Sequence, residues 1–158
     1  MDNRELKLIL LLFEGYDIHN KNHAEKTSKL AESIGLKMDL NNSDLKLLKK
    51  GALLHDIGKL MIPHDILNKP DKINNIEKEV ISAHPVIGAN LLEEAGYEKE
   101  IVEIAKFHHE WWDGSGYPDG LKEDEIPLLA QIISVVSAYD VMTSKKIYSY
   151  PKNKEEVY

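Results

Sequence analysis

The chain has 158 residues and no cysteine, which excludes disulfides and thiolate metal ligands. Positive charge is also scarce, since 20 lysines and arginines face 27 aspartates and glutamates for a net charge of −7. There is therefore no basic surface for duplex nucleic acid or an anionic membrane. No apolar run is long enough to span a bilayer, and the apolar start carries Arg4, Glu5 and Lys7 without a signal-peptide cleavage site. These absences predict a cytoplasmic protein that binds neither nucleic acid duplexes nor membranes.

The alternation of apolar and polar residues that is typical of a half-buried strand is missing, whereas helical spacing recurs along the chain. Helices are expected over residues 5–14, 17–34, 43–58, 73–95 with a break at His84-Pro85, 99–110 and 127–142. Gly15, Gly35 and Gly58 are expected to end the first three. Short connections and the chain length then predict a single-domain, all-α bundle over residues 1–158. Its leading helix lies within residues 1–14, and residues 145–158 form a polar, loosely ordered tail.

The most informative stretch is His55-Asp56-Ile57-Gly58-Lys59, which follows an apolar helical run. Ala52 and His55 share one helical stripe, so the helix that buries the apolar side chains also aims His55 inward. Imidazole and carboxylate are natural ligands of divalent transition metals, and the ammonium group of Lys59 suits an anionic substrate. Taken alone, the His55-Asp56 pair is weak evidence for a metal site, because a core histidine that is satisfied by its aspartate neighbour is the more common arrangement.

Other histidines occupy buried stripes or junctions of other predicted helices: His23 with Thr27, Leu30 and Ile34, His108 with Ile101, Ile104 and Ala105, and His84 beside Pro85. Each alone has an ordinary explanation as a satisfied core residue or a helix cap. Several buried imidazoles that converge with an aspartate are unfavourable unless they are paired or bound to metal, so their number favours a metal site. His64, in the turn at Pro63, is expected at the surface.

A glycine-rich loop, Trp111 to Gly120, follows His108-His109-Glu110. It could be an ordinary surface loop, but its glycines and aromatic residues come directly after two histidines. That position makes a ligand-binding loop the better interpretation.

Together these stretches resemble the HD superfamily of metal-dependent phosphohydrolases, specifically its HD-GYP branch. The matching segments, in chain order, are His55 to Lys59, Ile62-Pro63, Ile66 to Pro70, Glu77, His84-Pro85 with Gly88, His108 to Glu110, Trp112 to Gly114, Gly116 to Pro118 with Gly120, Ile126-Pro127, Tyr139-Asp140 and Thr143-Ser144. The similarity extends over roughly residues 17 to 148. It implies an all-helical fold, a two- or three-metal centre, and a phosphodiesterase that opens cyclic di-GMP in a signalling protein that also has a sensor or other partner domain.

The resemblance also implies roles for individual residues. The metal ligands would be His23, His55, Asp56, His84, His108 and His109, with Asp56 bridging two divalent ions. Asp56 and Lys59 would be catalytic, Lys59 would contact the scissile phosphate, and Gly116 to Pro118 would shape the nucleotide pocket. A metal-activated hydroxide would attack phosphorus in line. Iron or manganese is the expected metal, with zinc as an alternative, and a third ion is an alternative because His19 stands where some members place a glutamate ligand.

Several positions depart from the family pattern. Ser137 stands where the family has a ligand aspartate, and Asp140, one turn on, would replace it only if the helix shifted or rotated. Gln131 replaces an arginine, and Lys146 supplies the charge of a phosphate-holding arginine without its planar fork. The sequence also ends where family domains continue into further helices, which predicts a shortened or truncated member.

Two alternatives therefore stay open beside the phosphodiesterase. One is a catalytically degenerate signalling module that binds metal, a cyclic dinucleotide or a protein partner; Ser137 favours it, while the intact histidines and Lys59 oppose it. The other is an HD phosphohydrolase that acts on another nucleotide or a phosphomonoester, which the intact Gly-Tyr-Pro segment argues against.

Overall fold

The computed structural model describes residue 11 and residues 18–144, with side chains from Asn22 onward within the longer range. The helices in chain order are α2 (Ile18–Lys37), α3 (Asn42–Leu54), the 3-10 helix η1 (Ile57–Met61), α4 (His64–Leu67), α5 (Asn75–Ser82), α6 (His84–Glu94), α7 (Lys99–Phe107), the 3-10 helix η2 (Glu123–Glu125) and α8 (Leu128–Thr143). No strand occurs in the described ranges, which confirms the all-α prediction. Apart from residue 11, the expected leading helix lies outside these ranges, as do the tail with Lys146 and the side chain of His19.

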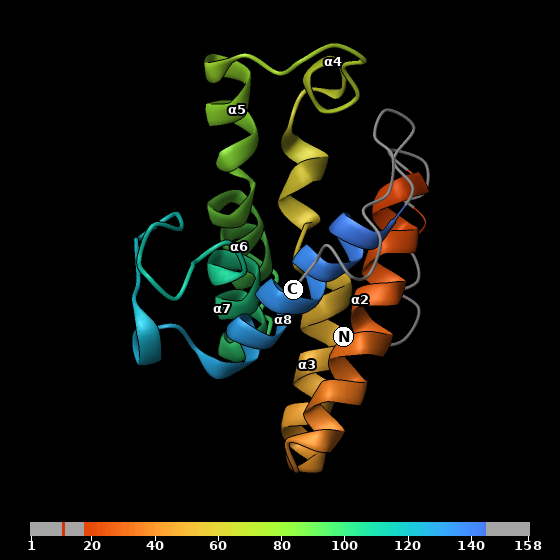
Figure 1. The fold of residues 1–158 in the computed structure, drawn as a ribbon, viewed down its shortest axis with the longest axis vertical. Coiled ribbons are helices and arrows are strands. Elements are labelled where there is room, and N and C mark those ends of the chain that lie inside the picture. Colours follow the sequence, from red (N-terminus) through yellow and green to blue (C-terminus); the bar gives the residue numbers. More distant parts are fainter. Residues whose placement is uncertain (1–10, 12–17, 145–158) are drawn as a thin grey trace.

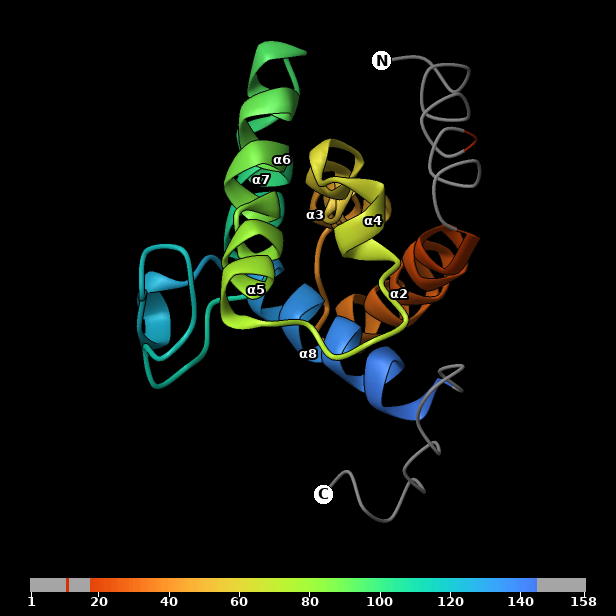
Figure 2. The same ribbon diagram turned by 90° about the horizontal axis from the view of Figure 1, so that it is seen from above.

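The described helices form two packed groups, which are joined by α8 and by direct packing of α3 against α7 (Figures 1 and 2). Helices α2 and α3 lie side by side, and α6 packs against α7. Helix α8 contacts α2 and α7, while η1 packs against α6. None of the helices described is long and apolar enough to cross a lipid bilayer.

The hydrophobic core fixes α3 and α7 from both sides. One buried cluster joins α3 and α7 to α2 and α8, and includes Ala31, Leu48 and Ile104. A second joins α3 and α7 to η1 and α6, and includes Leu54 and Leu92. Helices α3 and α7 belong to both clusters, so the C-terminal ends of these two helices are held in fixed positions.

Helix α2 ends later than its glycine predicts. It continues past Gly35 to Lys37, and Asp39 adopts the left-handed conformation with φ 55°. Gly35 instead allows close packing, because a Cβ there would lie 2.8 Å from Cδ2 of Leu45 on α3. The sequence placed Leu30 on the buried face of this helix, and that prediction was wrong. Leu30 is 36% exposed, whereas the neighbouring Ala31 is completely buried. The tight α2–α3 contact leaves room only for small side chains.

Other helix boundaries differ by a few residues. Helix α3 begins one residue earlier than predicted and is capped by Asn41, whose side chain accepts hydrogen bonds from the Ser43 and Asp44 backbone N–H groups. The α-helix then ends at Leu54, and Gly58 lies inside η1. The expected break at His84-Pro85 is confirmed, with Pro85 in the first turn of α6. His64 is exposed, as predicted.

A pair of glycines sets the distance between η1 and α6. A Cβ on Gly58 would collide with the backbone carbonyl of His84 and would lie 2.6 Å from the backbone nitrogen of Gly88. A Cβ on Gly88 would in turn lie 3.0 Å from the nitrogen of Gly58. This close backbone approach brings the start of α6, and with it His84, next to Asp56.

Candidate metal centre

Three histidines are held in the same way at the ends of helices. His55 caps the C-terminus of α3, His108 caps that of α7, and His84 follows the last turn of α5. In each, the ring Nδ1 bonds the backbone carbonyl three residues earlier, with distances of 2.8 Å to Ala52, 2.7 Å to Ile81 and 2.9 Å to Ala105. Because a carbonyl oxygen only accepts, Nδ1 carries the proton and Nε2 presents a lone pair.

These Nε2 atoms surround the carboxylate of Asp56. Its Oδ1 lies 3.1 Å from Nε2 of His84 and 3.6 Å from that of His108, and its Oδ2 lies 3.4 Å from Nε2 of His55. The Nε2 atoms of His84 and His108 are 3.3 Å apart. With the proton on Nδ1, the three Nε2 atoms and the two carboxylate oxygens can only accept hydrogen bonds, so none of them can donate to another.

The buried acceptors therefore lack partners within the described part of the chain. Asp56 Oδ1 and His55 Nε2 are both buried without a hydrogen bond. Buried polar atoms are normally satisfied, and a cluster of lone pairs and one carboxylate is compensated by a cation. Imidazole nitrogen and carboxylate oxygen are also the donor set that divalent transition metals prefer, so the residues present fit a metal site.

The protonation states agree with this interpretation. Burial lowers the pKa of His55 to about 3 and that of His109 to about 2, so both imidazoles are neutral near pH 7. Burial alone would raise the pKa of Asp56, but the Lys59 ammonium holds it well below its usual range. Lys59 Nζ donates to Asp56 Oδ2 at 2.6 Å, while its side chain stays 20% exposed.

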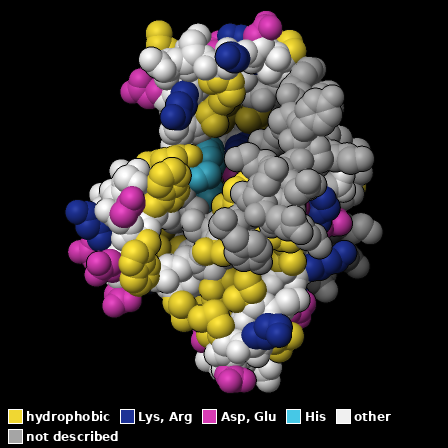
Figure 3. All heavy atoms as spheres, in the orientation of Figure 1, with side chains coloured by type: hydrophobic (Ala, Val, Ile, Leu, Met, Phe, Trp, Pro, Cys, Tyr) yellow, Lys and Arg dark blue, Asp and Glu magenta, His cyan; other side chains and the backbone are white. Residues whose placement is uncertain are grey.

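The predicted ligands form two groups that share Asp56. Asp56, His84, His108 and His109 each offer a ligand atom within 4.8 Å of the others, and so do His23, His55 and Asp56. A carboxylate that belongs to both groups could contribute to the binding of two ions. Figure 3 shows histidine side chains at the bottom of a hollow on the face viewed, where a substrate could reach them.

His23 brings α2 and α8 together at the second group. Its Nδ1 lies 2.7 Å from Oδ2 of Asp140, and its Nε2 lies 3.2 Å from the hydroxyl of Ser137. The structure thus places Asp140 against the outer nitrogen of His23 and outside both ligand groups of the described residues. A carboxylate in this position fixes the tautomer and leaves the Nε2 lone pair directed toward the second group.

Glu110 has a role that sequence reasoning did not assign. Its carboxylate is 2% exposed and accepts backbone N–H bonds from Asp119 (2.7 Å), Gly120 (3.0 Å) and Leu121 (3.0 Å). These bonds anchor the glycine-rich loop beneath His109. The sequence offered one signal for this role: Glu110 follows two histidines and directly precedes a glycine-rich loop, whose backbone N–H groups need acceptors.

The Gly-Tyr-Pro segment lies directly against this centre. The Tyr117 N–H donates to the His109 carbonyl at 3.1 Å, and the two side-chain rings are stacked with centroids 4.8 Å apart. Gly116 is required here, because a Cβ would lie 2.5 Å from that carbonyl and 2.6 Å from Cα of Glu110.

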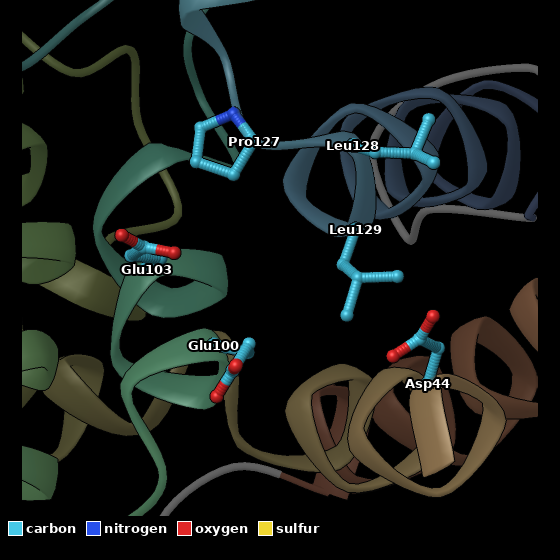
Figure 4. A pocket seen from close by; sticks show the side chains of 6 residues that line it. All are labelled: Asp44, Glu100, Glu103, Pro127, Leu128 and Leu129. Atoms are coloured by element: carbon cyan, nitrogen blue, oxygen red, sulfur yellow. The ribbon is translucent and has the colours of Figure 1, made fainter.

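A separate cavity of about 210 Å³ lies between α3, α7 and the start of α8 (Figure 4). It is lined by Asp44, Glu100, Glu103, Pro127, Leu128 and Leu129. It contains none of the predicted site residues, and its three carboxylates would repel a phosphate group. The hollow above the histidines is therefore the better candidate site.

Comparisons with known proteins identify the family of this chain. The HD domain family profile matches residues 12–157. A cyclic di-GMP phosphodiesterase of Thermotoga maritima is 37% identical over 155 residues, which cover 97% of this chain and 42% of that protein. The 3'3'-cGAMP-specific phosphodiesterase 2 of Vibrio cholerae is 31% identical over 139 residues, which cover 85% of this chain and 26% of that protein. The chain spans less than half the length of either relative.

A solved structure is also similar to this chain. Bd1817, an HDG"Y"P protein from Bdellovibrio bacteriovorus, superposes with a TM-score of 0.66 at 28% sequence identity. The match covers 75% of this chain and 39% of that protein.

Proposed function

The chain belongs to the HD-domain family, and on this basis we propose that it is a metal-dependent phosphodiesterase that hydrolyses a cyclic dinucleotide, with cyclic di-GMP as the first candidate. One observation carries the proposal: two groups of buried or half-buried ligand residues share the carboxylate of Asp56. The substrate class rests on the relatives, which are named for cyclic di-GMP and for 3'3'-cGAMP.

The proposed centre holds two divalent ions, iron or manganese, with zinc as an alternative. Asp56, His84, His108 and His109 would hold one ion, and His23, His55 and Asp56 the other. When bound, such ions supply an activated water molecule and neutralise negative charge on the phosphate.

Lys59 would bind the substrate phosphate directly. Its ammonium is fixed against Asp56 at 2.6 Å yet remains partly exposed, so it can contact both the centre and a bound anion. The chain carries a net charge of −7, so an anionic substrate needs such local positive charge. The same contact keeps Asp56 ionised, which is the form that binds metal.

The Gly116 to Pro118 segment would form the wall of the nucleotide pocket, since it lies beside His109. Roles for Lys146 as a phosphate ligand and for His19 as a third-metal ligand stay predictions. The cytoplasmic location and the partner signalling domain also stay predictions.

The test combines elemental analysis with an anaerobic hydrolysis assay. Protein loaded with Fe²⁺ or Mn²⁺ should contain two ions per chain and convert cyclic di-GMP to a linear product, followed by chromatography. At saturating metal, Lys59→Met should lower kcat/KM about 100-fold while the protein still contains two ions per chain. Lys99→Met, on an exposed side chain of α7, is the matched control. Parallel assays with 3'3'-cGAMP and with a phosphomonoester identify the substrate class.

A binding module without turnover is the second candidate, and Ser137 favours it. The Ser137 hydroxyl lies 3.2 Å from Nε2 of His23, on the ligand side of the ring, and a hydroxyl is a weaker ligand than a carboxylate. Two bound ions with no product from any substrate, together with calorimetric binding of cyclic di-GMP, would favour this function over the phosphodiesterase.

A further inference from the structure

His109 differs from the other candidate ligands in how its ring is held. His55, His84 and His108 donate from Nδ1 to backbone carbonyls, and His23 is paired with Asp140. Within the described residues, His109 makes no ring hydrogen bond that would fix its tautomer or its orientation. Ring contacts take the place of that bond.

Tyr117 makes the most parallel of these ring contacts. Its ring and that of His109 have centroids 4.8 Å apart and planes 15° apart, whereas His108 and His84 meet His109 at 45° and 90°. Tyr117 covers one face of the imidazole and so restricts its rotation about the side-chain bonds. Such stacked pairs stabilise a defined ring geometry.

Tyr117 is itself fixed by the loop. Its N–H donates to the carbonyl of His109, the ligand that it covers, and the backbone at Gly116 lies too close to residues 109–111 to move inward. Glu110 then closes the loop through its three bonds to the backbone N–H groups of residues 119–121. A buried carboxylate next to the ligand thus determines where the tyrosine ring lies.

We infer that Tyr117 and Glu110 are positioning residues of the metal centre: Tyr117 orients the His109 imidazole by stacking, and Glu110 holds the loop that carries Tyr117. This inference rests on the proposed function only in taking His109 as a metal ligand. It gives the Gly-Tyr-Pro segment a role at the metal in addition to any contact with the nucleotide.

The test measures metal binding without substrate. Mn²⁺ is titrated into metal-free protein, and free Mn²⁺ is followed by electron paramagnetic resonance. Tyr117→Leu should weaken one of the two sites about tenfold or more, because residues behind a ligand typically contribute 10- to 100-fold to affinity. Tyr117→Phe keeps the stacked ring and loses only the hydrogen bond between the hydroxyl and Ser82, so it should weaken Mn²⁺ binding far less than Tyr117→Leu does. Glu110→Ala should weaken the same site, and Glu110→Gln should do so to a smaller extent.

Trp112→Leu is the matched control, since Trp112 is a 58% exposed aromatic residue of the same loop and should have no effect. Circular dichroism checks that each variant is folded. If Tyr117→Leu proved unfolded, the comparison of Glu110→Gln with Trp112→Leu would decide in its place. Equal Mn²⁺ affinities for Tyr117→Leu, Glu110→Ala and the control would overturn the inference.

The ligand assignment is tested separately with His109→Ala. If that variant loses a Mn²⁺ site while Tyr117→Leu keeps it, the positioning role is wrong and the proposed ligand set stands. If His109→Ala keeps both sites, the ligand set and the inference both fail. The titration involves no turnover, so an absence of phosphodiesterase activity would not affect its outcome.

Discussion

Restoring a carboxylate at position 137 tests whether the His23 side of the centre is weakened in this chain. The Ser137 hydroxyl lies 3.2 Å from Nε2 of His23, which is the ring nitrogen left free by Asp140. In Ser137→Asp the side chain is one atom longer and carries a negative charge to the same place. We expect the variant to bind metal more tightly at the group of His23, His55 and Asp56.

The expected gain follows from charge and desolvation. A single negative charge and a divalent ion attract strongly at contact distance, but the new carboxylate must be buried close to Asp140 and Asp56. A net gain of about 10- to 100-fold in affinity remains, which corresponds to roughly 1.4 to 2.8 kcal/mol at saturating metal. In the metal-free protein the substitution should instead lower the stability, because the added carboxylate repels those of Asp140 and Asp56.

The assay is thermal unfolding with and without Mn²⁺, together with elemental analysis. Ser137→Asp should melt below the unmodified protein when metal is removed by a chelator, and above it when Mn²⁺ is saturating. Ala138→Asp, an exposed site on the same helix, adds the same charge away from the ligands and should show no such crossover. If both variants shift in the same direction with and without metal, Ser137 does not face a metal site and the reasoning is refuted.

Two further predictions concern packing and pH. Gly58→Ala should lower the free energy of unfolding by about 3 kcal/mol, because its Cβ would collide with the His84 carbonyl, and urea denaturation measures this loss. Metal-free protein should lose stability as the pH falls from 7 to 5, since the folded pKa of His55 is about 3 and the unfolded chain takes up protons below about 6.5. The loss is about 2 kcal/mol for this residue at pH 5, and His55→Gln should show a shallower dependence of melting temperature on pH.

The helices could be predicted because their apolar spacing is regular, but their ends depend on neighbours. The stripe of α7 that leads to His108 is buried as expected, since three apolar residues set one face. On α2 the same reasoning chose Leu30 over Ala31, because sequence does not show how closely α3 approaches. Gly35 failed as a helix end for the same reason: it provides space for Leu45 rather than a turn.

The residues of the candidate site could be predicted from the sequence, but the side chains that hold those residues in place could not. The resemblance named the histidines and Asp56, and the structure gathers five of these histidines around Asp56 in two groups, each with its ligand atoms within 4.8 Å of one another. Asp140 was considered as a ligand, whereas the structure pairs it with the far nitrogen of His23. The anchor at Glu110 depends on the path of a ten-residue loop, which no spacing rule describes.

The ends of α3 and α7 suggest how metal and substrate binding are ordered. Carbonyl groups in the last turns of these helices accept hydrogen bonds from the rings of His55 and His108, and the negative ends of both helix dipoles point at the centre. With Asp56 ionised, the metal-free centre attracts cations and repels phosphate. Cyclic di-GMP should therefore bind at least about tenfold more tightly to Mn²⁺-loaded protein than to chelator-treated protein, measured by calorimetry. Equal affinity in the two forms would show that the dinucleotide binds away from the histidines.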